Sequence, residues 1–442
     1  MAKKQAPQRE IFAEGKTKTI FRIREDLSVG FFMSKDDITK DDDPAKTRIL
    51  EGKGAWANTT TCNVFELIRR CGLPVSYLGK TMDREFSSEL CEMILLEVVI
   101  RRNKVGSYLE RFPNFKHPKD LPPLRSHQLV FELFLKTNKG KVKNRFGDLV
   151  AELPIDPKKN LPLDDPFIID PAAKIWELYW PKKPSWEKGA NLGITVEDYE
   201  ILPPGVTVAK IEEISRKCFL VLESAWASLG YRLIDFKIEL GINRKGQLVI
   251  SDVIDNDSWR LRDANWNELS KQLFRDNDVM EKIAYNYAKV AELTNHFNIS
   301  NQALVVWRGS NNDPILEVPE IPGIDVVNVI VSGHKSPNSA MEELEKIINN
   351  YPGGGVVIAE VGMSNGLGPT LSARTNWPLI SYAISGKSFP EDIWSSVRMP
   401  SEVPNLTVMD GTNAVSAALN ILARKNPAAY MYRQYAIEKL DK

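Results

Sequence analysis

The spacing of hydrophobic positions changes along this chain. Near the start, residues 11–21 alternate around a glycine turn, which is typical of two short strands joined as a hairpin. A helical spacing follows from Glu51 through Ile68, and the apolar run from Met93 to Ile100 predicts a buried strand. The first hundred residues are therefore predicted to mix helix and strand.

Prolines are concentrated between Pro154 and Pro204, where nine of the chain's 27 prolines lie. Proline lacks a backbone N–H, so we expect neither a regular helix nor a central strand in this segment. The segment also carries Trp176, Tyr179, Trp180 and Trp186. Because these side chains are too apolar for a solvated linker, we expect an ordered excursion.

Amphipathic segments follow the prolines. Residues 211–229 place apolar side chains three and four apart and end before Gly230, which predicts a helix. Residues 233–242 and 247–254 predict a hairpin. A further helix is expected over residues 278–296.

From about residue 298 the pattern changes to short, continuous apolar runs. These runs are residues 303–307, 326–331, 356–361 and 379–384. Such runs, separated by helical or irregular stretches, favour a parallel sheet with both faces covered. We therefore predict one domain over residues 1–297 and a second over residues 298–442.

The composition is that of a globular protein large enough for two or three domains. Its 58 basic and 58 acidic residues cancel, so we expect no bulk binding to nucleic acid or to an anionic membrane. The chain begins without an apolar leader, and no run approaches the roughly 18 apolar residues of a membrane helix. The four cysteines form no C-x-x-C pair. These features predict a reducing, cytoplasmic location.

The predicted hairpin carries charge on one face. Alternation along its first strand places Asp235, Lys237 and Glu239 on the same side. If a four-residue turn pairs Ile242 with Gln247, Lys237 lies opposite Asp252 and Glu239 lies diagonal to it. An ordinary solvated hairpin face is the alternative interpretation, but the acid-rich segment 252–260 favours a site.

Two other segments point to phosphate. Lys16 lies on the first glycine turn and Lys18 on the alternate residue after it, and such turns hold phosphates through amides and lysines. Together with Glu239 and Asp252, they predict a nucleotide site with magnesium. The Walker pattern is missing from the sequence, so this is no P-loop protein. Arg101, Arg102 and Ser107 follow a buried strand, where they form either a phosphate-monoester pocket or ordinary surface positions.

The order and spacing of these segments resemble SAICAR synthetase, the ATP-dependent ligase of purine biosynthesis. The segments are residues 14–18, 34–39, 50–53, 91–93, 101–107, 235–239 and 252–260. The resemblance covers most of residues 10–297 and implies an α+β, two-lobed, ATP-grasp-like domain. It also implies that ATP phosphorylates the carboxylate of carboxyaminoimidazole ribotide, whereupon the amine of L-aspartate displaces the phosphate.

The resemblance implies a role for individual residues. Lys16 and Lys18 would contact ATP, Glu239 and Asp252 would bind Mg²⁺, and Asp235 and Lys237 would be catalytic. The residues implied to bind the ribotide and aspartate are Arg101, Ser107, Lys136, Asp165, Asp257, Arg260, Lys271 and Arg275. The family's Lys-x-Asp…Asp-Pro segment is split here by the proline-rich excursion. Its second aspartate corresponds to Asp165 or Asp170, of which we assign Asp165.

Small polar loops follow each apolar run of the second domain, at the sheet edge where parallel α/β folds bind ligands. Residues 364–375 and 392–400 resemble class II phosphoribosylaminoimidazole carboxylase. This resemblance implies a three-layer α/β domain that moves carbon dioxide onto C4 of aminoimidazole ribotide. His334 would transfer the proton. The implied substrate-binding residues are Gly309, Ser310, Asp313, Ser332, Lys335, Ser364 and Asn365.

The second domain departs from that family's pattern. Arg308 and Met363 stand where methionine and arginine are expected, and the connection from Asp313 to Val326 is short for a helical crossover. A fully bifunctional enzyme is therefore one interpretation, and an oligomerisation or ribotide-binding scaffold is another. The apolar helix over residues 413–423 favours a homo-oligomer. A small-molecule kinase is the alternative for the first domain.

Overall fold

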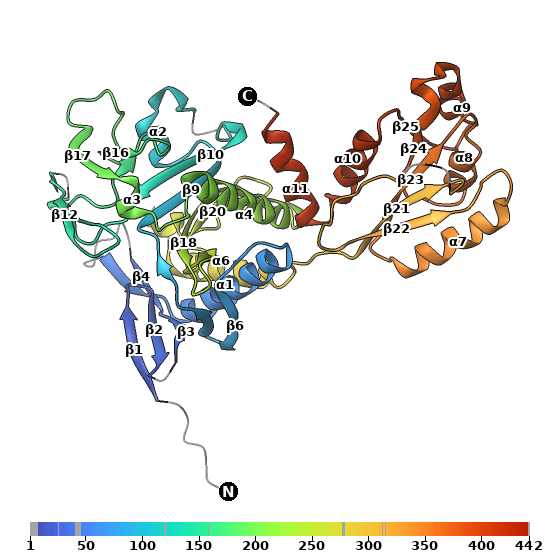
Figure 1. The fold of residues 1–442 in the computed structure, drawn as a ribbon. Coiled ribbons are helices and arrows are strands. Elements are labelled where there is room, and N and C mark those ends of the chain that lie inside the picture. The colour runs from blue at the N-terminus through green and yellow to red at the C-terminus, as the bar shows by residue number, and fades with distance from the viewer. Residues whose placement is uncertain are drawn as a thin grey trace, which may run out of the picture. The chain divides into compact units, whose positions relative to one another are not determined.

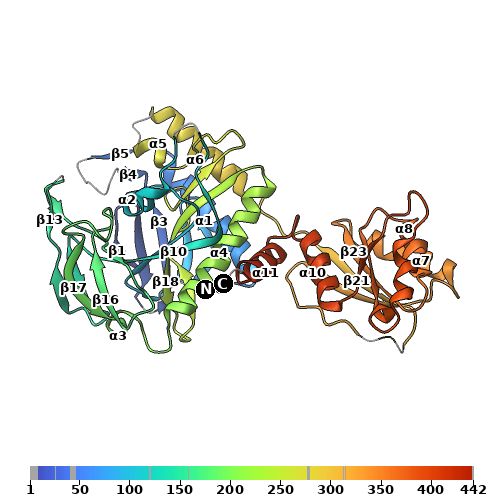
Figure 2. The ribbon, with the colours of Figure 1, turned by 90° about the horizontal axis from the view of Figure 1, so that it is seen from above.

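The computed structural model describes residues 8–24, 26–39, 46–118, 121–157, 159–275, 279–311, 313 and 315–440. The chain forms two compact units, which Figures 1 and 2 show as ribbons. The first unit comprises Met1–Phe297 with Glu438–Lys442, and the second comprises Asn298–Ile437. The main division lies where the hydrophobic pattern changes, whereas the return of the last residues to the first unit has no counterpart in the predictions.

A five-stranded antiparallel sheet, ordered β1-β2-β3-β7-β6, begins the first unit. Its strands are β1 (Arg9–Glu14), β2 (Lys18–Ile23), β3 (Asp26–Ser34), β6 (Tyr77–Met82) and β7 (Glu85–Glu89). The predicted first hairpin is thus confirmed by the pairing of β1 with β2. Helix α1 (Lys53–Arg70) buries Phe65 against Tyr77 and Phe86 of this sheet. A small ribbon, β4 (Asp37–Thr39) with β5 (Thr47–Ile49), precedes α1.

A nine-stranded sheet forms the other part of the first unit. Its main order is β17-β16-β15-β10-β9-β18-β19, and β8 and β20 also pair with β18. The strands are β8 (Glu92–Met93), β9 (Leu96–Asn103), β10 (Arg125–Leu135), β15 (Phe167–Ile168), β16 (Ile175–Tyr179), β17 (Asn191–Glu197), β18 (Arg232–Ile242), β19 (Leu248–Ser251) and β20 (Trp259–Arg262). Helix α4 (Val208–Ser228), predicted from its apolar spacing, packs Phe219 edge-on against Phe236 of β18.

Shorter elements complete the first unit. They are α2 (Ser107–Arg111), η2 (Pro113–Phe115), β11 (Lys141–Lys143), β12 (Leu149–Glu152), β13 (Ile155–Asp156), β14 (Leu161–Pro162), α3 (Asp198–Ile201), α5 (Gln272–Arg275) and α6 (Met280–Thr294). Helix α6 lies within the helix predicted over residues 278–296 and packs on α1. Across the described ranges, no helix has both the length and the apolar character of a membrane span.

The register predicted for the charged hairpin is wrong by one residue. Ile242 pairs with Leu248 instead of Gln247, so Glu239 faces Ser251 and the ladder ends before Asp252. The cause is the turn, where the Asn243 N–H donates to the carbonyl of Gln247 and leaves only three residues in the loop. Gly246 adopts φ 74° there, which suits the left-handed position of a three-residue hairpin loop.

The proline-rich excursion is ordered, as predicted, but it contains a strand with neighbours on both sides. β16 lies between β15 and β17 in the large sheet, which contradicts the expectation that no central strand forms there. The prolines flank β16 instead of interrupting it, so its N–H groups stay available for pairing. Trp176 on this strand is fully buried, whereas Trp186 is exposed.

The second unit contains a parallel sheet ordered β22-β21-β23-β24-β25. Its strands are β21 (Gln302–Arg308), β22 (Ile324–Ile330), β23 (Gly355–Val361), β24 (Leu379–Ala383) and β25 (Leu406–Val408). The four predicted apolar runs form β21 to β24, and β25 is additional. The helices are α7 (Pro337–Asn350), α8 (Leu367–Ser372), η3 (Ile384–Lys387), η4 (Pro390–Ile393), α9 (Trp394–Val397), α10 (Gly411–Leu422) and α11 (Pro427–Glu438), whose last residue belongs to the first unit.

Helices cover both faces of this parallel sheet. On one face α7 and α8 pack against Trp307 and its apolar neighbours, and Figure 1 shows α10 on the other. The connection from β21 to β22 has no helix in its described part, residues 309–311, 313 and 315–323. This agrees with the short crossover expected from the sequence.

Candidate active site

The buried carboxylate of Asp235 is the centre of a charged cluster in the large sheet. β18 places Asp235 opposite Arg101 of β9 on one side and opposite Arg260 of β20 on the other. Asp235 is 3% exposed and accepts hydrogen bonds from both guanidinium groups, at 2.5 Å from Arg260 Nη1. Sheet pairing therefore brings together three residues that lie 134 and 25 positions apart in the sequence.

A glycine turn completes this cluster beside β9. The Ser107 hydroxyl accepts a hydrogen bond from Arg101 Nη2 at 3.4 Å. Gly106 has φ 59°, and a Cβ at this position would lie 2.6 Å from Arg260 Nη2. A side chain at position 106 would thus both strain the backbone and displace Arg260.

The sequence predictions missed Glu132, which is the second carboxylate on Arg101. Glu132 lies on β10, is 4% exposed, and accepts from Arg101 Nε at 2.7 Å and from Arg111. These two guanidinium groups outweigh the effect of burial and hold the pKa of Glu132 below its usual range. The available signal was a lone acid within the apolar end of β10.

Lysine and carboxylate pairs form a second cluster between the two sheets. Lys18 of β2 pairs with Asp252, Lys136 pairs with Glu239, and Lys237 pairs with Glu97 at 2.6 Å. Burial, reinforced by the nearby ammonium groups of Lys136 and Lys237, lowers the pKa of Lys18 to about 8 despite neighbouring carboxylates. Lys16 lies exposed in the β1–β2 turn.

Asp165, not Asp170, joins this second cluster. Its carboxylate accepts from the backbone N–H of Thr137 at 2.9 Å, directly after Lys136. Burial and the charge of Glu97 raise the pKa of Asp165 to about 7. Asp170 is exposed, and its carboxylate accepts from the backbone of Ala172 in a local turn. Although the proline-rich excursion separates them in the sequence, Asp165 therefore lies beside Lys136 in the fold.

A third group links α1 to the end of the large sheet. Lys53, 1% exposed, reaches Asp257 at 3.1 Å, and Asp257 also contacts Lys271 at 3.4 Å. Although burial acts in the opposite direction, both lysines hold the pKa of Asp257 well below its usual range. Burial and the adjacent Asp257 raise the pKa of Asp255 to about 6. The side chain of Arg275 lies outside the described structure.

No role was predicted for Lys53, although its segment was recognised. A lysine at the first position of a helix opposes the helix dipole, which is the signal that could have identified it.

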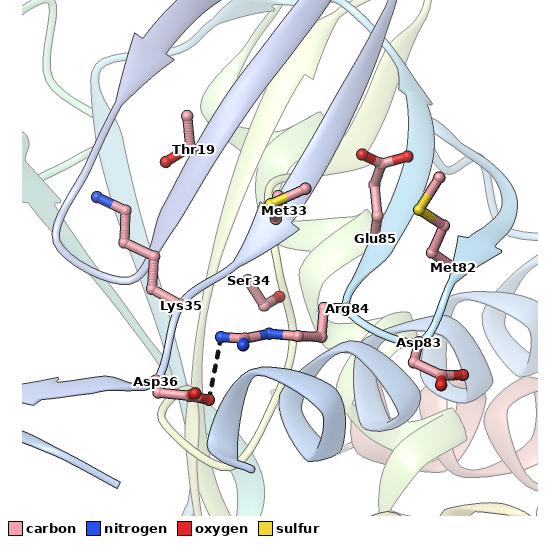
Figure 3. A pocket seen from close by; sticks show the side chains of 9 residues that line it. All are labelled: Thr19, Met33, Ser34, Lys35, Asp36, Met82, Asp83, Arg84 and Glu85. Atoms are coloured by element: carbon pink, nitrogen blue, oxygen red, sulfur yellow. Dashed lines mark ion pairs between the residues drawn. The ribbon is translucent and has the colours of Figure 1, made fainter. Parts of the chain in front are cut away.

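A cavity of about 510 Å³ lies at the end of the small sheet, where its lining residue Asp36 accepts from the backbone N–H of Gly54, next to Lys53 of the third group. Its lining residues are Thr19, Met33, Ser34, Lys35, Asp36, Met82, Asp83, Arg84 and Glu85. Figure 3 shows Arg84 reaching Asp36, at 3.1 Å, beside the start of α1. Lys35 pairs with Glu14, and Glu85 pairs with Arg9. Because its charges are largely satisfied by the protein and it contains no predicted site residue, we do not place the reaction here.

The second unit gathers its predicted residues at the carboxyl edge of the parallel sheet. After β21, the carboxylate of Asp313 accepts from the backbone N–H of Ser310 at 2.9 Å, directly after Gly309. After β22, the Ser332 hydroxyl accepts from the backbone N–H of Lys335 at 3.2 Å.

His334 and the loop after β23 are packed together at this edge. A Cβ on Gly366 would lie 2.3 Å from His334 Nε2, so only glycine permits this approach. Ser364 is exposed, as is His334. Asn365 is buried, and its side chain bonds Ser381, Ser396 and the backbone of Gly368, so it anchors the loop.

Two charged residues, Glu360 and Arg308, are buried in the parallel sheet near this edge. Glu360 of β23 lies between Arg308 of β21 and Tyr382 of β24 in register, and it is 3% exposed. Burial raises the pKa of Glu360 to about 7, although Arg308 and the Leu316 backbone oppose the shift.

This raised pKa predicts a pH-dependent stability. Between pH 4.5 and 7 the folded chain retains a proton on Glu360 that the unfolded chain releases, so the free energy of unfolding should fall as the pH rises. We expect the free energy of unfolding of wild type, relative to that of Glu360→Gln, to fall by up to about 3 kcal/mol between pH 4.5 and 7. Above this window the difference should fall no further. Denaturant titrations of both proteins at pH 5, 6, 7 and 8 measure the difference. A constant difference would contradict the expectation.

Comparisons with known proteins agree with both units. A family model described as SAICAR synthetase matches residues 11–148 and 194–292, and one described as AIR carboxylase matches residues 312–438. The chain is 32% identical to "Probable multifunctional protein ADE2" of Caenorhabditis elegans over 434 residues, covering 94% of this chain and 90% of that protein. The chain belongs to the SAICAR synthetase family. Its second unit is an AIR carboxylase-like domain.

The name of one further relative of this SAICAR synthetase family member contains both activities. The "Bifunctional phosphoribosylaminoimidazole carboxylase/phosphoribosylaminoimidazole succinocarboxamide synthetase" of Homo sapiens is 28% identical, covering 93% of this chain and 90% of that protein. A solved structure, "SAICAR synthetase (Type-2) in complex with ADP", is 24% identical, with a TM-score of 0.46 and coverage of 64% of this chain and 97% of that one. The family model does not match residues 149–193, which include most of the proline-rich excursion.

Proposed function

We propose that the first unit ligates L-aspartate to carboxyaminoimidazole ribotide and forms SAICAR in purine biosynthesis. ATP transfers its terminal phosphoryl group to the ribotide carboxylate, releasing ADP. The aspartate amine then attacks the acyl phosphate, forming an amide and releasing phosphate and a proton. The observation that carries this proposal is the arginine cluster around Asp235 beside the lysine cluster around Glu239, in a chain of this family.

The lysine cluster supplies the charge that phosphoryl transfer needs. Lys18 would face the nucleotide phosphates, with Lys16 on the β1–β2 turn, and Lys136 would face the ribotide, because transfer between anions depends on neutralisation and alignment. Glu239 and Asp252 would hold Mg²⁺, which takes one or two protein carboxylates and neutralises phosphate oxygens. In the structure Asp252 pairs with Lys18 and Glu239 with Lys136, and these lysines would turn to the nucleotide and the ribotide, respectively, when the substrates bind.

The arginine cluster suits the ribotide. Arg101 and Arg260 share Asp235 and leave further N–H donors for phosphate or carboxylate oxygens, and Ser107 adds a hydroxyl. Asp235 therefore sets the spacing of two guanidinium groups. Lys237 would act from the lysine cluster, where it pairs with Glu97 and interacts with Glu239 and Asp165. Lys271 and Asp257 would hold aspartate, together with Arg275.

The second unit is proposed to bind aminoimidazole ribotide at the loops that contain Ser310, Ser332 and Ser364, with His334 as the proton-transfer group. Carbon dioxide would be the second substrate of a carboxylase there, and its product would serve the first unit. Assembly through α10, the ATP-grasp-like arrangement of the first unit and a cytoplasmic location also remain predictions.

An assay of ADP release tests the ligase directly. We expect the purified chain with ATP, Mg²⁺ and carboxyaminoimidazole ribotide to release ADP at a rate that requires L-aspartate, with SAICAR formed in equal amount. Omitting each substrate in turn provides the controls. ADP release that is independent of aspartate and yields a stable phosphorylated product would show a small-molecule kinase instead.

A further inference from the structure

The strand β10 is interrupted beside Arg101. Its pairing with β9 jumps from Arg125 opposite Asn103 to Val130 opposite Arg101. Four residues of β10, 126–129, therefore face the single residue Arg102 and cannot all pair with β9. Buried backbone groups in such an irregular stretch need other partners.

Arg102 and Glu438 supply partners for this stretch. Arg102 Nη1 donates to the carbonyl of His127 at 2.6 Å. Glu438 Oε2 accepts from the backbone N–H of Leu129 at 3.0 Å, and the Glu438 carbonyl accepts from Gln128 Nε2 at 2.8 Å. Glu438 thus accepts hydrogen bonds from the interrupted stretch of β10, which lies more than 300 positions earlier in the sequence.

Arg102 and Glu438 also form an ion pair with each other. Arg102 Nη2 lies 2.7 Å from Glu438 Oε1, and Glu223 of α4 contacts the same guanidinium at 2.6 Å. Arg102 is 2% exposed and Glu438 is 5% exposed. Loss of Glu438 would remove one acceptor of Arg102, which keeps both of its hydrogen bonds to Glu223, and would leave the Leu129 N–H unpaired, which is costly for a buried group.

The interrupted stretch determines how β10 meets the arginine cluster. Directly after it, Val130 pairs with Arg101, and two residues later Glu132 accepts from Arg101 Nε at 2.7 Å. Arg101 and Arg102 are consecutive on β9, so one guanidinium contacts the cluster and the other contacts Glu438. A shift of β10 would therefore move Glu132 relative to Arg101.

We propose that Glu438 is a positioning residue for the ribotide-binding part of the synthetase unit. It acts through Arg102 and the Leu129 N–H to fix β10, and thereby Glu132 and Arg101. This inference rests on the proposed function of the first unit. The synthetase family match ends at residue 292, so Glu438 lies outside it, within the stretch matched by the carboxylase model.

Steady-state kinetics of full-length variants test the proposal. Glu438→Ala should raise the KM for carboxyaminoimidazole ribotide about tenfold, because small displacements of a binding group are costly. The KM for ATP and the kcat should stay within about threefold of wild type. Glu438→Gln, which keeps an acceptor for Leu129, should give an intermediate KM. Leu440→Ala, at a side chain 81% exposed, is the matched control and should behave as wild type.

Hydrogen exchange provides a readout without turnover. In Glu438→Ala the Leu129 amide should exchange faster than in wild type, whereas amides of α10 should be unchanged; Leu440→Ala should change neither. Equal increases in both KM values, or a loss of thermal stability alone, would reveal a merely structural role and overturn the inference. The inference would also be overturned if wild type turned over normally and both Glu438 variants kept the wild-type KM for the ribotide. A wild-type chain without ligase turnover would overturn the proposed function, and this inference with it.

Discussion

Replacing Glu239 by glutamine should lower ligase turnover about 10²- to 10³-fold, the usual cost of removing one preorganised electrostatic contact. Glu239 is the carboxylate that pairs with Lys136, and Lys18 and Lys237 lower its pKa further, although burial opposes them. Glutamine keeps the size and one acceptor but removes the negative charge proposed to hold Mg²⁺. The kcat at saturating substrates measures the effect, and the Mg²⁺ concentration for half-maximal rate should rise.

A matched control separates this effect from loss of a surface charge. Glu213 pairs with Lys217 on the exposed side of α4, and Glu213→Gln should leave turnover unchanged. Near-normal turnover in a folded Glu239→Gln protein, at ordinary Mg²⁺ concentrations, would show that Glu239 is not a metal ligand.

The charged hairpin illustrates what the sequence can and cannot predict. Strict alternation placed Asp235, Lys237 and Glu239 on one side of a strand, because side chains alternate whatever the partner strand does. The register with β19 depends instead on the turn, where the hydrogen bond from Asn243 to Gln247 shortened the loop. Asp252 still reaches Lys18, but from a left-handed residue beyond the ladder, with φ 65°.

Long-range partners were the hardest part to predict. The pairing of β18 with both β9 and β20 puts Arg101 and Arg260 on Asp235, but a resemblance to a family was needed to select them. Glu132 carried one local signal, as the lone acid in the apolar end of β10, but nothing local distinguishes Glu438 from other acids. In the second unit, by contrast, continuous apolar runs predicted four of five strands, since a sheet covered on both faces needs apolar residues throughout.

The second large effect is expected at His334. Any carboxylation by the second unit should fall at least 10²-fold in His334→Asn, because a positioned acid or base contributes about 10²- to 10⁴-fold to rate. Asparagine retains a polar side chain but does not titrate near neutral pH. Ligase turnover should stay within twofold of wild type. Formation of carboxyaminoimidazole ribotide and its decarboxylation should be measured for both proteins side by side.

The structure gives this experiment two further arms. His334, the residue proposed to transfer the proton, lies against Gly366 at the sheet edge, whereas Met363 is 78% exposed where the resemblance to the carboxylase implies arginine. If the missing cation limits the rate, Met363→Arg should raise carboxylation in wild type but not in His334→Asn. Carboxylation that persists unchanged in His334→Asn would refute the role of this histidine. Ribotide binding without carboxylation in wild type and in Met363→Arg would identify a ribotide-binding scaffold, because the shortened β21–β22 crossover would then have removed catalysis and kept the loops.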